Sequence, residues 1–153
     1  MENQNGIQIY GFSTDNNLSN NKCSLNTESG LEIKGNSDGN LLMNNTFIEN
    51  QYGIAIYQSS DENRLLNNSF VRNEEYGVKI TDNSRDNVIV GNTFIENNNG
   101  SIQASDYCWG TQWDLNGSGN YWSDWMGPDE NYDGIVDIGY AIYGSVKHMD
   151  HFP

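Results

Sequence analysis

The sequence predicts an all-β fold: a parallel β-helix of about four to five coils, closed by a C-terminal aromatic cap that carries a calcium loop. Three observations predict it: a repeat of fixed period, alternating apolar residues within each repeat, and a change of composition after the last one. A fixed period in the low twenties is typical of a solenoid, in which each repeat stacks on its neighbour. The period is carried by glycines 23 or 24 residues apart, at Gly6, Gly30, Gly53, Gly77 and Gly100.

The third repeat shows how each coil forms. Ile54 and Ile56 alternate with Ala55, which is typical of a strand with one buried face. Two further short strands carry the inward residues Leu65 and Phe70, with polar turns between the strands. Each strand is expected to pair with its counterpart one coil on, about 4.8 Å away. Equivalent residues therefore form columns along the solenoid.

Asparagines occupy the predicted bends in three sets that keep the period of the repeat. In a stacked solenoid, each side-chain amide can donate to one coil and accept from the next, so we expect hydrogen-bonded ladders. The sets are Asn16, Asn40, Asn63 and Asn87; Asn21, Asn45, Asn68 and Asn92; and Asn26, Asn50, Asn73 and Asn97.

The repeat stops after Gly100, which predicts coils over 6–105, a capping module over 106–143 and a tail over 144–153. All four tryptophans lie beyond the repeat. Such aromatics could cover the open end of the core or offer flat faces to sugar rings. The sequence leaves both alternatives open for Trp109, Trp113, Tyr121, Trp122 and Trp125.

The composition excludes some partners. The net charge is −14, and seven Lys and Arg residues cannot form the basic surface that nucleic acid requires. No apolar run is long enough to span a membrane. The N-terminus lacks a signal-peptide pattern, which predicts a mature fragment or a protein not secreted by that route. Cys23 and Cys108 should stay unbridged, because four coils would separate them.

The segment DENYDGIVD, residues 129–137, is the most specific candidate site. Side-chain oxygens at alternate positions, a glycine at the sixth and a backbone carbonyl at the seventh match a calcium loop. We therefore predict a structural Ca²⁺ that pins the cap. Its ligands would come from Asp129, Asn131, Asp133, Ile135 and Asp137.

Candidates for catalysis are few. Glu32 and Lys79 share one outward column, two coils and about 10 Å apart, and Asp61 has an acidic neighbour on the adjacent coil. β-Helix enzymes that act on polysaccharides use clustered carboxylates or a Lys or Arg base. These residues thus leave open a polysaccharide lyase, hydrolase or epimerase, although a non-catalytic module is favoured.

The C-terminal run His148-Met149-Asp150-His151 has two interpretations. Two histidines three residues apart near a methionine could bind copper or zinc. Alternatively, the run is a frayed tail, which is common at chain ends.

Two apolar rows are predicted to point away from the core. Exposed apolar strips usually mark a covered surface, so either the C-terminal segment folds back over one row or a partner, including a second copy, binds there. The rows are Met43, Leu66 and Val90, and Ile48, Val71 and Ile95.

These motifs resemble a known family. The repeat GIxI…SxxNxL…NNxFxxN is similar to the parallel β-helix repeats of NosD-type and CASH proteins, the carbohydrate-binding and sugar-hydrolase group. Residues 119–142, GNYWSDWMGPDENYDGIVDIGYAI, resemble the terminal motif of archaeal, especially methanogen, cell-surface proteins. The resemblance covers about residues 6–143. It implies a right-handed β-helix, an extracytoplasmic location and a role around surface polysaccharide.

The resemblance further implies an excised C-terminal portion of a longer protein, since family members have more coils. NosD itself is associated with copper-site maturation of nitrous oxide reductase. We predict a calcium-stabilised extracellular or cell-surface module that binds or scaffolds carbohydrate, with surface polysaccharide or another surface protein as partner. The alternatives are a polysaccharide lyase or epimerase fragment, and a homo-oligomeric subunit that stacks through its open first coil or apolar rows.

Overall fold

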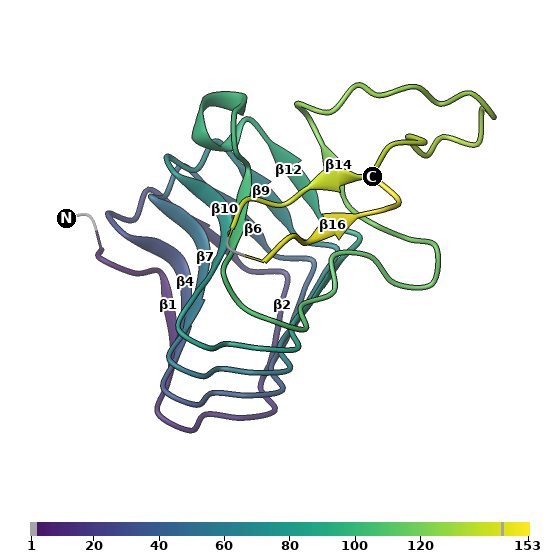
Figure 1. Cartoon of the computed structure of the whole chain (residues 1–153). Helices are drawn as coiled ribbons and strands as arrows, with labels where there is room; N and C mark the ends of the chain where they lie inside the picture. The colour runs from purple at the N-terminus through teal and green to yellow at the C-terminus, as the bar shows by residue number, and fades with distance from the viewer. Residues whose placement is uncertain (1–2, 145) are drawn as a thin grey trace.

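The computed structural model describes residues 3–144 and 146–153, which form a parallel β-solenoid closed at one end (Figure 1). Three parallel sheets run along it, in the orders β1-β4-β7-β10-β13, β2-β5-β8-β11 and β3-β6-β9-β12-β14. We call these the first, second and third sheets. No helix in the described ranges is long and apolar enough to cross a membrane.

The strands are short, and their bounds repeat with each coil. The first sheet contains β1 (Ile7–Tyr10), β4 (Ser29–Lys34), β7 (Tyr52–Tyr57), β10 (Tyr76–Ile80) and β13 (Ala104–Asp106). The second contains β2 (Asn17–Ser19), β5 (Leu41–Met43), β8 (Arg64–Leu66) and β11 (Val88–Val90). The third contains β3 (Lys22–Ser24), β6 (Thr46–Ile48), β9 (Ser69–Val71), β12 (Thr93–Ile95) and β14 (Tyr121–Trp122). A helical turn, η1 (Asn97–Gly100), and an antiparallel pair, β15 (Tyr140–Ala141) with β16 (Met149–Asp150), complete the chain.

The core consists of in-register columns, as predicted. Leu31, Ile54 and Val78 face one another on successive strands of the first sheet, and all three are fully buried. The third sheet contributes a phenylalanine column, in which the rings of Phe47 and Phe70 stack with centroids 5.5 Å apart. The spacing of coils thus sets the spacing of rings, and burial of these columns stabilises the stack.

The glycine that opens each coil leaves room for this column. A Cβ atom on Gly53 would lie 2.4 Å from the carbonyl oxygen of Gly77 and 2.7 Å from the ring of Phe70. Since no side chain fits there, the recurring glycine reflects close packing between coils.

The asparagine ladders form at the bends. Asn68 Oδ1 accepts from both the backbone N–H of Asn45, at 2.9 Å, and its side-chain Nδ2, at 3.0 Å. The same Nδ2 also donates to the carbonyl oxygen of Leu18, at 2.9 Å. The Asn45 amide therefore joins three coils, and Asn50, Asn68, Asn73 and Asn92 repeat this pattern of bonds to the coils before and after, which satisfies backbone groups that the turns leave unpaired.

The fifth coil begins later than the glycine spacing predicts. Ala104 pairs with Val78, so Gln103 rather than Gly100 occupies the coil-opening position. The turn η1 accounts for the shift, because Asn98 and Asn99 adopt left-handed backbone conformations and add residues before β13. The domain boundaries drawn from the repeat remain predictions.

The cap continues the columns of the coils. The Trp122 ring stacks on Phe94 with centroids 4.2 Å apart, and Tyr140 stacks on Trp122 at 4.0 Å. The C-terminal residues, for which fraying was one expectation, are integrated: β16 pairs with β15, and the side chain of Asp150 is fully buried. Both cysteines are free and buried.

Candidate ligand-binding cleft

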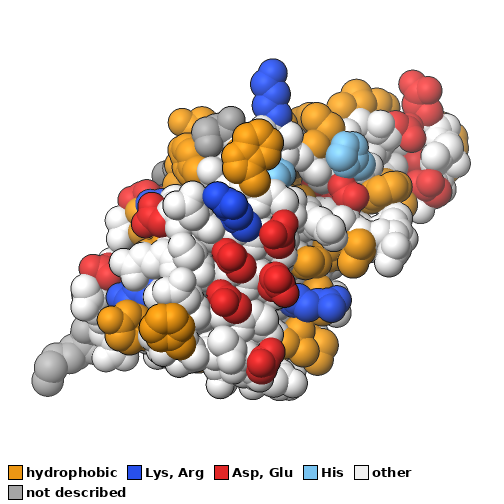
Figure 2. All heavy atoms as spheres, turned by 60° about the horizontal axis from the view of Figure 1, so that its bottom comes forward, with side chains coloured by type: hydrophobic (Ala, Val, Ile, Leu, Met, Phe, Trp, Pro, Cys, Tyr) orange, Lys and Arg blue, Asp and Glu red, His pale blue; other side chains and the backbone are white. Residues whose placement is uncertain are grey.

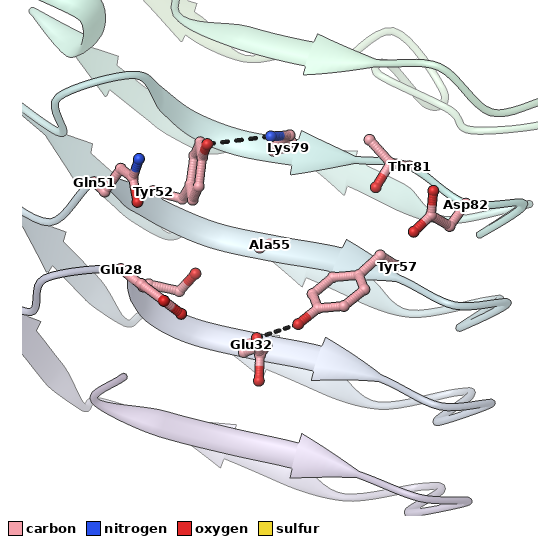
Figure 3. Close-up of a pocket in the computed structure, with 10 residues that line it drawn as sticks. Glu28, Glu32, Gln51, Tyr52, Ala55, Tyr57, Lys79, Thr81 and Asp82 are labelled. Atoms are coloured by element: carbon pink, nitrogen blue, oxygen red, sulfur yellow. Dashed lines mark hydrogen bonds between the residues drawn. The ribbon is translucent and has the colours of Figure 1, made fainter. Parts of the chain in front are cut away.

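A cleft lies on the outer face of the first sheet, over the middle three coils (Figure 3). It follows an outward row in which strand pairing aligns Glu32 with Ala55 and Ala55 with Lys79. Its volume is about 340 Å³, within the roughly 300–1,000 Å³ range of small-molecule sites. The residues that line it include Glu28, Glu32, Tyr52, Tyr57, Lys79 and Asp82.

The cleft exists because Ala55 is small and the tyrosines on either side of it turn in opposite directions. Tyr57 reaches back one coil and donates to Glu32 Oε1, whereas Tyr52 turns toward the next coil, where Lys79 Nζ lies 3.1 Å from its hydroxyl oxygen (Figure 3). The Lys79 ammonium also lies 4.4 Å from the centre of the Tyr52 ring. The result is a polar floor between two aromatic walls.

Glu32 is held as a fixed acceptor. Besides Tyr57, its carboxylate accepts from Gln8 Nε2 at 2.7 Å and lies 2.8 Å from Lys34 Nζ. Only 5% of the residue is exposed. Because donors from its own strand and from the strands on either side engage the two oxygens, the carboxylate is held in a fixed orientation and can orient a ligand.

The two cleft tyrosines stay protonated. Burial, followed by the hydrogen bond to Glu75 Oε2 at 2.8 Å, raises the pKa of Tyr52 far above its usual range. Burial and then Glu32 likewise raise the pKa of Tyr57. Neither phenol can act as a general base near neutral pH, and each hydroxyl already donates its hydrogen to a glutamate. The two tyrosines therefore offer the cleft ring faces and hydroxyl oxygens.

Two of the three catalytic candidates meet in this cleft. Glu32 and Lys79 line it, but Asp61 lies in a turn, where its Oδ1 accepts the backbone N–H of Arg85 at 2.7 Å. Those turns carry acidic side chains that gather on one face of the molecule (Figure 2). The sequence reasoning missed Tyr52 and Tyr57, although their places at both ends of β7 were a usable signal.

The cap aromatics divide into two groups. Trp113 and Trp122 are buried in the core, 1% and 2% exposed, and Trp125 packs against that core. Trp113 and Trp122 thus cover the end of the solenoid, whereas the partly buried Trp125 also lines surface pockets beside the cap. Trp109 and Tyr121 are exposed, so these two residues and the partly exposed Trp125 provide the outward aromatic surface among the five candidates.

The predicted calcium loop closes on itself. Asp129 accepts the backbone N–H groups of Asp133 and Gly134, at 3.2 and 3.0 Å. Asp137 Oδ2 accepts the backbone N–H of Glu130, at 2.6 Å. Among residues 3–144 and 146–153, no group of three or more His, Cys, Asp or Glu side chains could hold a metal ion. The calcium prediction is therefore corrected: Asp129, Asn131, Asp133 and Asp137 form hydrogen-bonded turns, with Ile135 donating its N–H to Asp133.

The two C-terminal histidines face acceptors. His148 Nε2 lies 2.7 Å from the carbonyl oxygen of Cys108 and 3.4 Å from Asp106 Oδ2, so it carries a hydrogen and donates. His151 Nδ1 lies 2.7 Å from Asp114 Oδ2. One nitrogen of each imidazole ring thus contacts its own acceptor, and the two rings do not converge on a common metal position.

The outer apolar rows are half-buried along the second and third sheets, while β15 and β16 lie at the cap end (Figure 1). The rows remain predicted interface residues. They are Met43, Leu66 and Val90, and Ile48, Val71 and Ile95.

Comparison with known proteins supports the fold and the repeat. A probable ABC transporter binding protein NosD from Stutzerimonas stutzeri is 45% identical over 38 residues, which are 25% of this chain and 9% of that protein. No solved structure matches the chain. The likeness to archaeal surface proteins stays a prediction. A family model described as periplasmic copper-binding protein (NosD) matches residues 1–127, and the chain therefore belongs to the NosD family.

Proposed function

We propose that this NosD-family solenoid is a non-catalytic, extracytoplasmic carbohydrate-binding module whose ligand lies in the cleft over Ala55. The observation that carries the proposal is the pair of tyrosines that flank this small residue, above a row of fixed polar groups. Sugars need both elements: ring faces for their C–H surfaces and oriented groups for their hydroxyls.

The charges and contacts favour binding over catalysis. Glu32 is engaged by three side chains, Tyr52 and Tyr57 stay protonated, and Asp61 lies outside the cleft. A lyase or epimerase requires a base that is free to accept a carbon-bound proton. Since Lys79 is the one remaining candidate and already contacts the Tyr52 hydroxyl, we assign Glu32 and Lys79 to ligand positioning.

The family description supports an extracytoplasmic location for this chain. The same description names copper as a ligand of the family. The residues present do not fit a copper site, because both thiols are buried and His148 and His151 face separate acceptors. Burial raises the pKa of both thiols, which disfavours the thiolate that copper prefers. We therefore assign no role that depends on copper.

A glycan array tests the proposal, with wild-type protein and the variant Ala55→Trp, whose indole would fill the cleft. The control is Arg64→Trp, which adds the same side chain on the exposed face of the second sheet. We expect wild-type protein and the control to bind the same neutral oligosaccharides, and Ala55→Trp to lose at least tenfold in affinity.

Unaltered binding by Ala55→Trp would contradict the cleft as the site, and so would an array on which no sugar binds. Circular dichroism and a thermal melt verify that each variant is folded. Tyr52→Leu provides a second variant, which removes one aromatic wall and should weaken binding in the same direction.

A second candidate function is association through the apolar rows. Their half-buried residues recur on every coil from β5 to β12, which makes a continuous apolar strip on each of two sheets. If copies associate there, Leu66→Lys or Val71→Lys will reduce the mass measured by light scattering after size exclusion. A monomeric wild-type protein at high concentration would exclude self-association.

A further inference from the structure

We infer that the cleft binds the end of a neutral glycan chain and not its interior; this rests on the proposed carbohydrate function. The row that forms its floor runs along the solenoid, from Gln8 through Glu32, Ala55 and Lys79 to Ser105. A chain lying along this row would cross one coil after another. The cleft can bind the interior of a chain only if the outward row stays accessible up to the cap.

The row is closed immediately after Lys79. Ser105, next in register, is fully buried, although its side chain belongs to the outward row. Tyr143 from the C-terminal segment pairs with Ser105, and its carbonyl oxygen accepts the N–H of Asp106 at 2.8 Å. This segment thus takes the place of a sixth strand and puts a tyrosine in the row.

Two further tyrosines complete the closed end. Tyr107 packs edge-on against Tyr143, with ring centroids 6.1 Å apart. Tyr76 stacks on Tyr52 at 6.3 Å, so the aromatic wall of the cleft continues toward this closed end. None of Tyr76, Tyr107 and Tyr143 lines the cleft, which ends on that side at Lys79, Thr81 and Asp82. A chain that enters over Glu32 would therefore stop there.

The accessible length of the cleft matches the last few sugar units of a glycan chain. The lining comes from three successive coils, and two strand spacings give about 10 Å, the length of about two sugar rings. Glu28, Glu32 and Asp82 set three carboxylates in the lining against the one ammonium of Lys79. This balance repels uronic acids and favours neutral sugars.

The stoichiometry of binding distinguishes an end from an interior. Calorimetric titrations would use malto-, cello-, xylo- and manno-oligosaccharides and chitin oligosaccharides, each from disaccharide to heptasaccharide, together with a long polymer of each type that binds. If the cleft takes a chain end, one protein binds per chain at every length, and affinity stops rising beyond the disaccharide or trisaccharide.

Opening the closed end provides the matched variant. Tyr143→Ala should let chains pass, so that affinity continues to rise with length and several proteins bind each polymer. The control Tyr132→Ala removes an exposed tyrosine from the acidic loop, away from the cleft, and should behave as wild type. Thermal melts verify that both variants are folded.

The outcomes separate this inference from the function on which it rests. If several wild-type proteins bind each long chain and Ala55→Trp abolishes that binding, the cleft is a sugar site and the end-binding inference is wrong. If none of the oligosaccharides binds, both proposals fail. One protein per chain in the wild type, with more in Tyr143→Ala, supports both.

Discussion

Asp150 Oδ2 accepts the backbone N–H of Asn120 at 2.6 Å, in the way that each ladder asparagine accepts from the coil before it. Asn120 itself accepts the N–H of Asn92 at 3.0 Å, so the ladder that begins at Asn21 ends on a buried carboxylate. Trp122 Nε1 donates to the same oxygen at 3.0 Å. The C-terminal strand therefore supplies the last acceptor of a ladder that spans the solenoid.

Removing this acceptor should destabilise the whole fold. In Asp150→Ala, the donors on Asn120 and Trp122 lose their partner in a dry environment, at about 1–3 kcal/mol for each unsatisfied group. We expect the free energy of unfolding in urea to fall by about 3 kcal/mol or more. Glu49→Ala is the control: it breaks an exposed ion pair with Arg72, and the expected change is about 0.5 kcal/mol or less. Equal losses in both variants would contradict a terminating role for Asp150.

Stability should rise as pH falls below neutrality. Burial raises the pKa of Asp106 and of Asp150 above the usual 3.8. A raised folded-state pKa means that the native protein binds a proton more readily than the unfolded chain does. The resulting stability is fully present below the unfolded pKa and is lost as pH rises through the folded pKa.

The measurement for this pH effect is the midpoint of thermal unfolding from pH 7 to about pH 5. We expect the midpoint of the wild type to increase, and the increase to be smaller in Asp106→Asn with Asp150→Asn, which no longer titrate. The informative quantity is the difference between the midpoint increases of wild type and double variant, because protonation of exposed carboxylates reduces their mutual repulsion in both proteins. Parallel curves for wild type and double variant would contradict this assignment.

Trp122 should matter more to stability than any exposed aromatic of the cap. Its ring is 2% exposed and stacks between Phe94 and Tyr140, so Trp122→Ala should cost about 3–5 kcal/mol. Trp109 is 69% exposed, and Trp109→Ala is the control, with an expected change near zero. Chemical unfolding of both variants measures this, and a costly Trp109→Ala would show that the cap depends on its outer aromatics too.

Ser105→Ala should be neutral or stabilising. The Ser105 hydroxyl is buried without a hydrogen-bond partner, and burying an unpaired hydroxyl costs about 1–3 kcal/mol. Removing the hydroxyl leaves a small cavity, and the stability lost through that cavity is smaller than the stability gained. We expect the free energy of unfolding to rise by about 1 kcal/mol; a decrease would imply that the hydroxyl is satisfied in solution.

Removing divalent metal should leave stability unchanged. The acidic loop is closed by its own backbone, since Asp129 accepts from two successive N–H groups and Asp133 Oδ1 accepts the N–H of Ile135 at 2.8 Å. We expect the same melting temperature in EDTA and in millimolar calcium. A clear fall in EDTA would overturn the correction of the calcium prediction.

The regular coils were predictable because every residue type recurs in a column. The spacing of glycines gave the coil length, and the alternation of Ile54, Ala55 and Ile56 gave the buried face. Each of these signals repeats four times, so a local exception such as Cys23 among phenylalanines did not obscure the pattern.

The cap and the cleft were less predictable because their residues meet once and at long range. Nothing in the sequence pairs Asp150 with Asn120 thirty positions earlier, and the run around it was interpreted as a frayed tail in preference to a metal site. The acidic loop matched a calcium spacing, but its geometry depends on which N–H groups its carboxylates meet. The cleft depends on side-chain rotamers, because Tyr52 and Tyr57 share a strand but turn toward different coils.

The terminated ladder has a consequence for how such a protein could change size. The Asp150 side chain joins the ladder at the bend directly before it, through Asn120 and Trp122. An additional coil inserted among the regular ones would meet the same neighbours as any existing coil. Duplication of one repeat can therefore change the number of coils by one without altering the contacts of the cap. The cleft would lengthen with it, while the closed end would keep its shape.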